Sequence, residues 1–126
     1  MAIIAVDMRL LLGIEDTDHG IQALETTVRR AEQTGDELTV AIYATDDSLE
    51  ETESAVRDRI ETLGADCSVE RIESDPGSRL VELAESGGYD QIVLSGGQRS
   101  PLGKIKLDDV HEFVLLNSRT TVKLVR

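Results

Sequence analysis

The sequence predicts an α/β protein: a doubly wound, five-stranded parallel sheet with helices on both faces, the arrangement called Rossmann-like. Short apolar runs without helical periodicity alternate with segments whose apolar residues recur every three or four positions. Strands covered on both faces read as continuous apolar runs, and strands that alternate with helices form parallel sheets. No linker, repeat or low-complexity tract interrupts the pattern, which predicts one domain over residues 1–126.

Five segments have the character of strands. The clearest is RLLLGI at residues 9–14, whereas residues 67–72 alternate apolar and polar side chains as a strand near an edge does. The others cover residues 38–44, 92–94 and 120–125. An apolar run at residues 2–6 is either a further edge strand or an N-terminal extension.

Each helical segment places its apolar residues on one face, at the spacing of an amphipathic helix. These faces comprise Ile21, Leu24, Val28 and Ala31 in the first helix, Val56, Ile60 and Leu63 in the second, Leu80, Leu83 and Ala84 in the third, and Val110, Phe113 and Val114 in the fourth.

Capping and stop residues mark where these helices begin and end. Ser48 with Glu51 predicts a capping box at the start of the second helix, and Asp75 followed by Pro76 predicts an N-cap and first helical position for the third. Glycines predict the ends of the first three helices, at Gly35, Gly64 and the Gly87–Gly88 pair.

The net charge of −12 arises from 25 acidic against 13 basic residues. A nucleic-acid-binding surface needs a basic patch, so the charge argues against that class of partner. Only Lys104, Lys106 and Lys123 are lysines, and the other basic residues are arginines. An acidic, lysine-poor surface suits a high-salt cytoplasm, because salt screens its self-repulsion. We therefore hypothesise a halophilic source.

No run is long and apolar enough to span a membrane, and residues 1–8 lack the basic and apolar regions of a signal peptide. We therefore expect a soluble, cytoplasmic protein that binds no membrane. The lone Cys67 is interpreted as a small buried hydrophobe. His19 and His111 are far apart in the sequence and lack metal-ligand spacing, so both are interpreted as ordinary surface histidines. No catalytic residues or metal ligands are predicted, and enzyme activity is not expected.

The stretch of greatest functional interest is a strand, a Gly-rich loop and the helix that follows, because such loops hold phosphates in parallel α/β sheets. Free backbone N–H groups and the helix dipole converge there. The loop contains Gly96 and Gly97 together with Arg99, Ser100, Lys104 and Lys106.

In its element order, and in the passages DPGSRLVELAESGGYDQIVLS and RSPLGKIKLDDVHEFVLLNSRTTVKLVR, the chain resembles the universal stress protein family. The resemblance runs from about residue 9 to the end. It implies a sheet of order 3-2-1-4-5. It also implies a homodimer in which the last strands of two subunits, each beginning at Thr120 and ending at Val125, pair antiparallel and cover an open edge.

The nucleotide-binding branch of that family carries Gly, two residues, Gly, nine residues, and then Gly-Ser or Gly-Thr. Here those positions hold Ser95, Gln98 and the pair Asp108 and Asp109. Glu15 occupies the place of the acidic residue, usually Asp, that contacts the nucleoside. The resemblance therefore implies a dimeric regulatory or interaction module of the branch that does not bind ATP, with no cofactor and with a possible protein partner.

Asp108 and Asp109 would place two carboxylates where phosphate oxygens would lie. Asp109 with Glu112 three residues later is also an ordinary capping arrangement, and carboxylates are favoured at that end of the helix dipole. The alternative is a nucleotide- or anion-binding protein that uses the modified loop at residues 95–109, with ATP or AMP and magnesium as ligands and slow ATP hydrolysis as its activity. In that case the backbone of the glycines and the side chains of Arg99, Ser100, Lys104 and Lys106 would hold a displaced phosphate or another anion.

Overall fold

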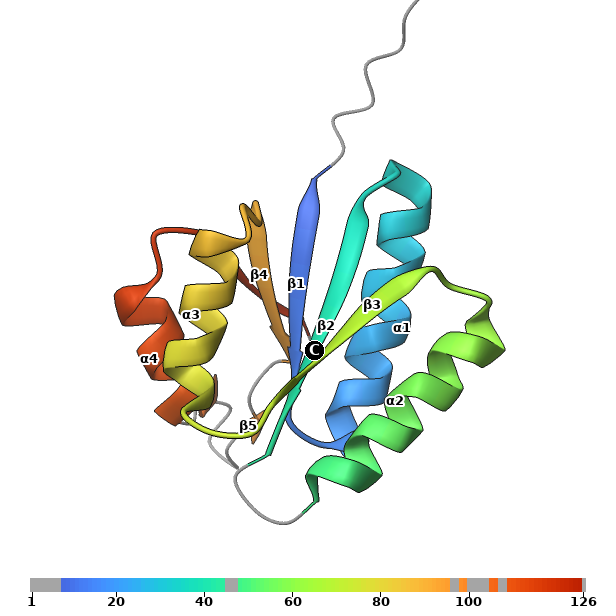
Figure 1. Cartoon of the computed structure of the whole chain (residues 1–126), viewed down its shortest axis with the longest axis horizontal. Coiled ribbons are helices and arrows are strands. Elements are labelled where there is room, and N and C mark those ends of the chain that lie inside the picture. The colour runs from blue at the N-terminus through green and yellow to red at the C-terminus, as the bar shows by residue number, and fades with distance from the viewer. Residues whose placement is uncertain (1–7, 45–47, 96–97, 100–104, 107–108, 126) are drawn as a thin grey trace, which may run out of the picture.

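The computed structural model describes residues 8–44, 48–95, 98–99, 105–106 and 109–125 of the chain. Its main sheet has five parallel strands in the order β3-β2-β1-β4-β7 (Figure 1). They are β1 (Arg9–Ile14), β2 (Glu37–Tyr43), β3 (Cys67–Ile72), β4 (Gln91–Ser95) and β7 (Thr121–Val125). The predicted doubly wound sheet of order 3-2-1-4-5 is therefore confirmed, and residues 67–72 do lie at an edge.

Helices cover both faces of this sheet, as predicted. Helices α1 (Thr17–Thr34) and α2 (Leu49–Leu63) lie together on one face, and α3 (Pro76–Ser86) and α4 (Asp109–Asn117) lie together on the other (Figure 1). Side chains alternate along each strand, so Leu10 and Leu12 of β1 belong to the core under α1 and α2, while Leu11 belongs to the core under α3 and α4. Burial on both faces explains the unbroken apolar run.

The helix ends agree with the predicted stop residues, but the side-chain caps at two helix starts do not form. Gly35 and Gly64 end α1 and α2 in the left-handed conformation, at φ 76 and 64. Ser48 and Asp75 are N-cap residues, yet neither side chain makes a capping hydrogen bond. An N-cap side chain reaches the first turn from extended backbone. Ser48 at ψ 6 and Asp75 at φ 48 are not extended, so the predicted capping box is wrong.

A second, smaller sheet was not predicted. Strands β5 (Gln98–Arg99) and β6 (Ile105–Lys106) pair antiparallel, Gln98 with Lys106 and Arg99 with Ile105. This ladder lies between β4 and α4 in the chain, within the Gly-rich segment. Two-residue strands carry no hydrophobic period, so the pattern could not reveal them. The apolar run at residues 2–6 lies outside the described residues.

Candidate functional site

The candidate site lies where the strand order reverses, between β1 and β4. These strands pair in parallel from Leu10 with Gln91 to Gly13 with Leu94, so their carboxyl ends meet at one edge of the sheet. The helix after β1 lies on one face and the helix after β4 on the other. Parallel α/β sheets bind ligands in the crevice outside the carboxyl ends of the strands at such a switch point.

The structure brings part of the predicted set to this edge. Glu15 directly follows β1 and is half-buried, and Ser95 is the last residue of β4. Asp109 is the first residue of α4 and is exposed. Gln98 and Arg99 are placed as backbone in β5. The remaining predicted positions lie outside the described residues: Gly96, Gly97, Ser100 and Asp108.

The β1–α1 turn is held by local polar contacts. Asp16 is the N-cap of α1, and its carboxylate accepts a hydrogen bond from the backbone N–H of His19 at 3.1 Å. His19 is exposed, as predicted, with its Nδ1 3.9 Å from the same carboxylate. Gly20 lies against Ile14, so the first turn of α1 closely approaches the end of β1. This contact fixes the backbone around Glu15.

His111 is the site residue that the sequence interpretation missed. It is 5% exposed, and its Nε2 lies 2.8 Å from the backbone oxygen of Ser95. A carbonyl oxygen only accepts, so Nε2 carries the proton and donates. The prediction of a surface histidine is therefore wrong. The available signal was spacing, because His111 lies between Val110 and Val114 on the buried side of α4.

The hydrogen bond from His111 joins the first turn of α4 to the end of β4. A second contact fixes the same helix from the side, where the Phe113 ring packs against Gly77 of α3. The start of α4 is therefore held on the sheet and against α3. Its first turn carries the carboxylates of Asp109 and Glu112, at the end of the helix where the dipole stabilises negative charge, as predicted. Asp109 is the first helical residue, however, and not the cap that the sequence predicted.

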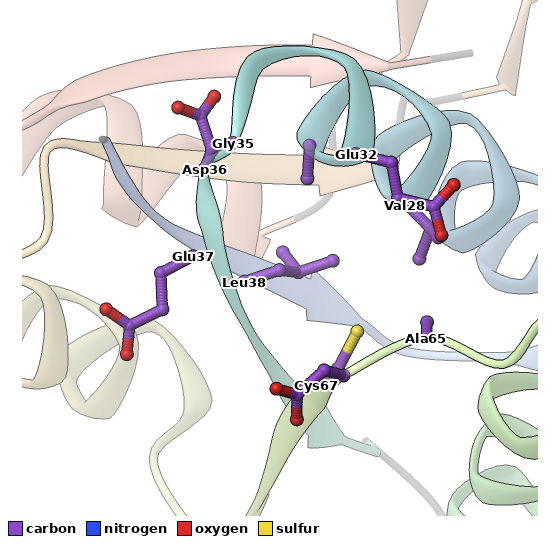
Figure 2. A pocket seen from close by; sticks show the side chains of 10 residues that line it. Val28, Glu32, Gly35, Asp36, Glu37, Leu38, Ala65 and Cys67 are labelled. Carbon is purple, nitrogen blue, oxygen red and sulfur yellow. The ribbon is translucent and has the colours of Figure 1, made fainter. Parts of the chain in front are cut away.

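A cavity of about 300 Å³ lies at the opposite end of the sheet, near the amino ends of β2 and β3. Its lining residues are Val28, Ala31, Glu32, Gly35, Asp36, Glu37, Leu38, Ala65, Asp66 and Cys67. Figure 2 shows the Cys67 sulfur pointing into the space between Leu38 and Ala65, while the carboxylates of Asp36 and Glu37 point away from it. The cavity is therefore separate from the switch point.

Cys67 is half-buried, less than the sequence interpretation predicted. Burial raises the pKa of its thiol, and the negative charges of Asp66 and Glu32 raise it further. The thiol is therefore held in its protonated, weakly nucleophilic form.

Among the described residues, no three His, Cys, Asp or Glu side chains are grouped so that they could hold a metal ion. No described helix is both long enough and apolar enough to cross a membrane.

Comparison with known proteins identifies the fold. No protein-family model matches the chain, and no curated protein matches it in sequence. Solved structures do match, and universal stress proteins are among them. One from Archaeoglobus fulgidus has a TM-score of 0.77 and 21% identity, over 96% of this chain and 100% of its own. A universal stress protein in complex with cAMP has a TM-score of 0.73 and 24% identity, over 95% and 97% of the two chains.

The universal stress protein from Archaeoglobus fulgidus in complex with dAMP has a TM-score of 0.71 and 19% identity, over 96% of this chain and 99% of its own. These matches cover almost the whole of both chains. At such identities they establish a shared architecture. The chain therefore has the fold of universal stress proteins.

Proposed function

We propose that this protein is a cytoplasmic, dimeric regulatory or interaction module of the universal stress protein type, which does not hold ATP in the manner of its nucleotide-bound structural neighbours. The observation that carries the proposal is the carboxylate of Asp109 in the first turn of α4. That helix start is the place where a phosphate would use the free N–H groups and the dipole.

The electrostatic cost of a phosphate beside Asp109 is large on the scale of binding. Two like charges at about 4–6 Å, in an effective dielectric near 20, repel by about 3–4 kcal/mol. Since a tenfold change in affinity corresponds to about 1.4 kcal/mol, one such contact weakens binding by roughly two to three orders of magnitude. Molar salt shortens the screening length to about 3 Å and reduces this penalty, so any residual binding should strengthen with salt.

The two edges of the sheet support a dimer through the last strand. On the β3 edge, Arg71 forms ion pairs with Glu53, Glu73 and Glu50, at 3.2, 3.4 and 3.9 Å. Charged side chains of this kind discourage strand pairing. The β7 edge carries the alternating sequence TVKLV, and its outer side pairs with no strand among the described residues. We propose that a second copy pairs antiparallel along Thr120 to Val125.

The decisive experiment is calorimetric titration with ATP, AMP and cAMP in the presence of magnesium, at low and at molar salt. The unmodified protein should show no micromolar binding. The triple variant Gln98→Gly, Asp108→Gly and Asp109→Ser should gain at least tenfold in ATP affinity, because it removes the carboxylates and restores the small residues of the family motif. Micromolar binding by the unmodified protein would overturn the proposal.

The second candidate function is nucleotide or anion binding by residues 95–109, with slow ATP hydrolysis as its activity. The observation that favours it is that structural neighbours contain cAMP or dAMP. Absorbance at 260 nm of the freshly purified protein distinguishes the two candidates. The chain has no Trp and two Tyr, so co-purified nucleotide would dominate the spectrum.

A further inference from the structure

In the described part of the chain, the large apolar side chains that are exposed all belong to one helix. Among the described residues, the large hydrophobic side chains with high exposure are Phe113 at 40%, Leu115 at 43% and Leu116 at 84%, all in α4. Isolated exposed leucines are common on protein surfaces, so the direction in which each of these side chains points decides whether another element could cover it.

The three side chains point in different directions around α4. Val110, His111 and Val114 face the sheet, and Phe113 packs sideways against Gly77 of α3. Leu115 is two residues further along, a rotation of about 200°, so it lies on the flank opposite α3.

That flank faces the open edge of the sheet. Helix α3 lies over β1, where Leu80 is against Gly13. Helix α4 lies over β4, since His111 contacts the backbone oxygen of Ser95, and the chain runs from α4 directly into the edge strand β7. The side of α4 that faces away from α3 is therefore the side toward the free edge of β7, and Leu115 projects there.

A second copy paired on β7 would bring its own α4 to this flank. An antiparallel pair of identical edge strands is related by a two-fold axis perpendicular to the sheet, so both α4 helices lie on the same face. If α4 lies between β4 and β7, its symmetry mate lies about two strand spacings away, or about 10 Å. Helices pack at this distance.

The charge distribution favours the same contact. No Asp or Glu occurs from Phe113 to the end of the chain, in a protein with 25 acidic residues. Two copies that each carry a net charge of −12 repel least where the acidic residues are absent. This stretch contains Leu115 and the whole of β7, whereas the acidic residues of α4, Asp109 and Glu112, lie in its first turn.

We propose that Leu115 packs against its counterpart on the α4 helix of a second copy, forming an apolar layer above the joined β7 strands. The inference rests on the proposed β7 pairing and adds a helix–helix contact to it.

The two-fold symmetry also limits the register in which the two β7 strands can pair. Residues that face each other across an antiparallel pair lie on the same face of the sheet. The residue at the centre of a symmetric pair therefore faces its own copy, and the two-fold axis passes midway between the two. Centring on Lys123 would oppose two ammonium groups, which favours Val122 or Leu124 as the centre.

The test compares three variants by sedimentation over a range of concentrations, with circular dichroism to verify folding. Leu115→Asp should raise the dimer dissociation constant at least tenfold, because both copies then place a carboxylate in the apolar layer. Leu116→Asp is the matched control: it lies on the same helix, is more exposed, points outward, and should change the constant by less than twofold. Val122→Pro removes a ladder donor and should abolish the dimer.

Disulfide trapping provides an independent measurement. With Cys67→Ser removing the native thiol, Leu115→Cys should oxidise to a covalent dimer and Leu116→Cys should not. Helix axes about 10 Å apart leave about 5 Å between facing Cα atoms, within the range that a disulfide spans.

The outcomes separate the two proposals. A dimer that Leu115→Asp leaves as tight as the unmodified protein, or that Leu116→Asp weakens equally, would refute the helix contact while leaving the β7 pairing in place. An unmodified protein that sediments as a monomer at all concentrations would refute the dimer itself.

Discussion

The close approach of Gly20 to Ile14 gives a quantitative prediction for the backbone beside Glu15. A Cβ atom added at Gly20 would lie 2.4 Å from Cγ2 of Ile14. Ile14 is fully buried in the core under α1 and α2, so its methyl group has little room to yield. We therefore expect Gly20→Ala to destabilise the protein, although alanine is the better helix former.

Two opposing terms set the magnitude of this effect. Overpacking a core by one methyl group costs about 1–3 kcal/mol. Replacing glycine by alanine inside a helix contributes about 0.5–1 kcal/mol in the other direction. The two ranges together give a net loss of about 0–2.5 kcal/mol in the free energy of unfolding, centred on about 1 kcal/mol. The double variant with Ile14→Ala should lose less than the sum of the two single changes, because the smaller side chain makes room for the new methyl group.

Urea denaturation of the four proteins in this cycle, followed by circular dichroism, measures both quantities. The slopes of the unfolding curves should remain equal, so that differences in midpoint report stability. Two results would refute the reasoning. One is a Gly20→Ala variant at least as stable as the unmodified protein. The other is strict additivity with Ile14→Ala, which would mean that the two side chains do not collide.

Four further predictions concern other features of the chain. His111→Leu should lower the free energy of unfolding by about 1–3 kcal/mol, because Ser95 loses its donor; urea denaturation measures this, and an unchanged midpoint would exclude the bond. The raised pKa of Cys67 means that the folded state holds the thiol proton more firmly than the unfolded state. The free energy of unfolding should therefore fall as the pH rises past the ordinary thiol pKa, and Cys67→Ser should remove this part of the pH dependence. In the same range, Asp66→Asn should speed alkylation by iodoacetamide at fixed pH; an unchanged rate would rule out the charge effect. Finally, a net charge of −12 predicts that the melting temperature rises from low to molar salt, and a flat profile would contradict the halophilic hypothesis.

The sequence predicted the sheet well because every central strand is buried on both faces. Leu10, Leu11 and Leu12 are buried in turn on alternate sides, and that produces an apolar run which no amphipathic helix would show. The β5–β6 ladder gave no such signal, because two-residue strands are too short to have a period. The caps at Ser48 and Asp75 failed for a different reason. Residue type predicts which side chains are able to cap, but the local backbone angles decide whether they do.

The candidate site was predicted only in part. The carboxyl ends of β1 and β4 followed from topology, and with them the places of Glu15 and Ser95. His111 was missed because a histidine counts as polar in a hydrophobic pattern, even where one buried hydrogen bond makes it part of the core. Its environment depends on how α4 lies across β4, and that depends on tertiary packing that a linear pattern does not contain.

The three ion pairs of Arg71 have a consequence for assembly. Charged side chains at the β3 edge disfavour pairing with another strand, so a strand that joins the sheet is expected to pair with β7. In a dimer paired through β7, the outer strand at both ends of the combined sheet is β3. Neither end then favours pairing with another copy. Assembly through the sheet edges is therefore expected to end at the dimer and not to continue into a fibre.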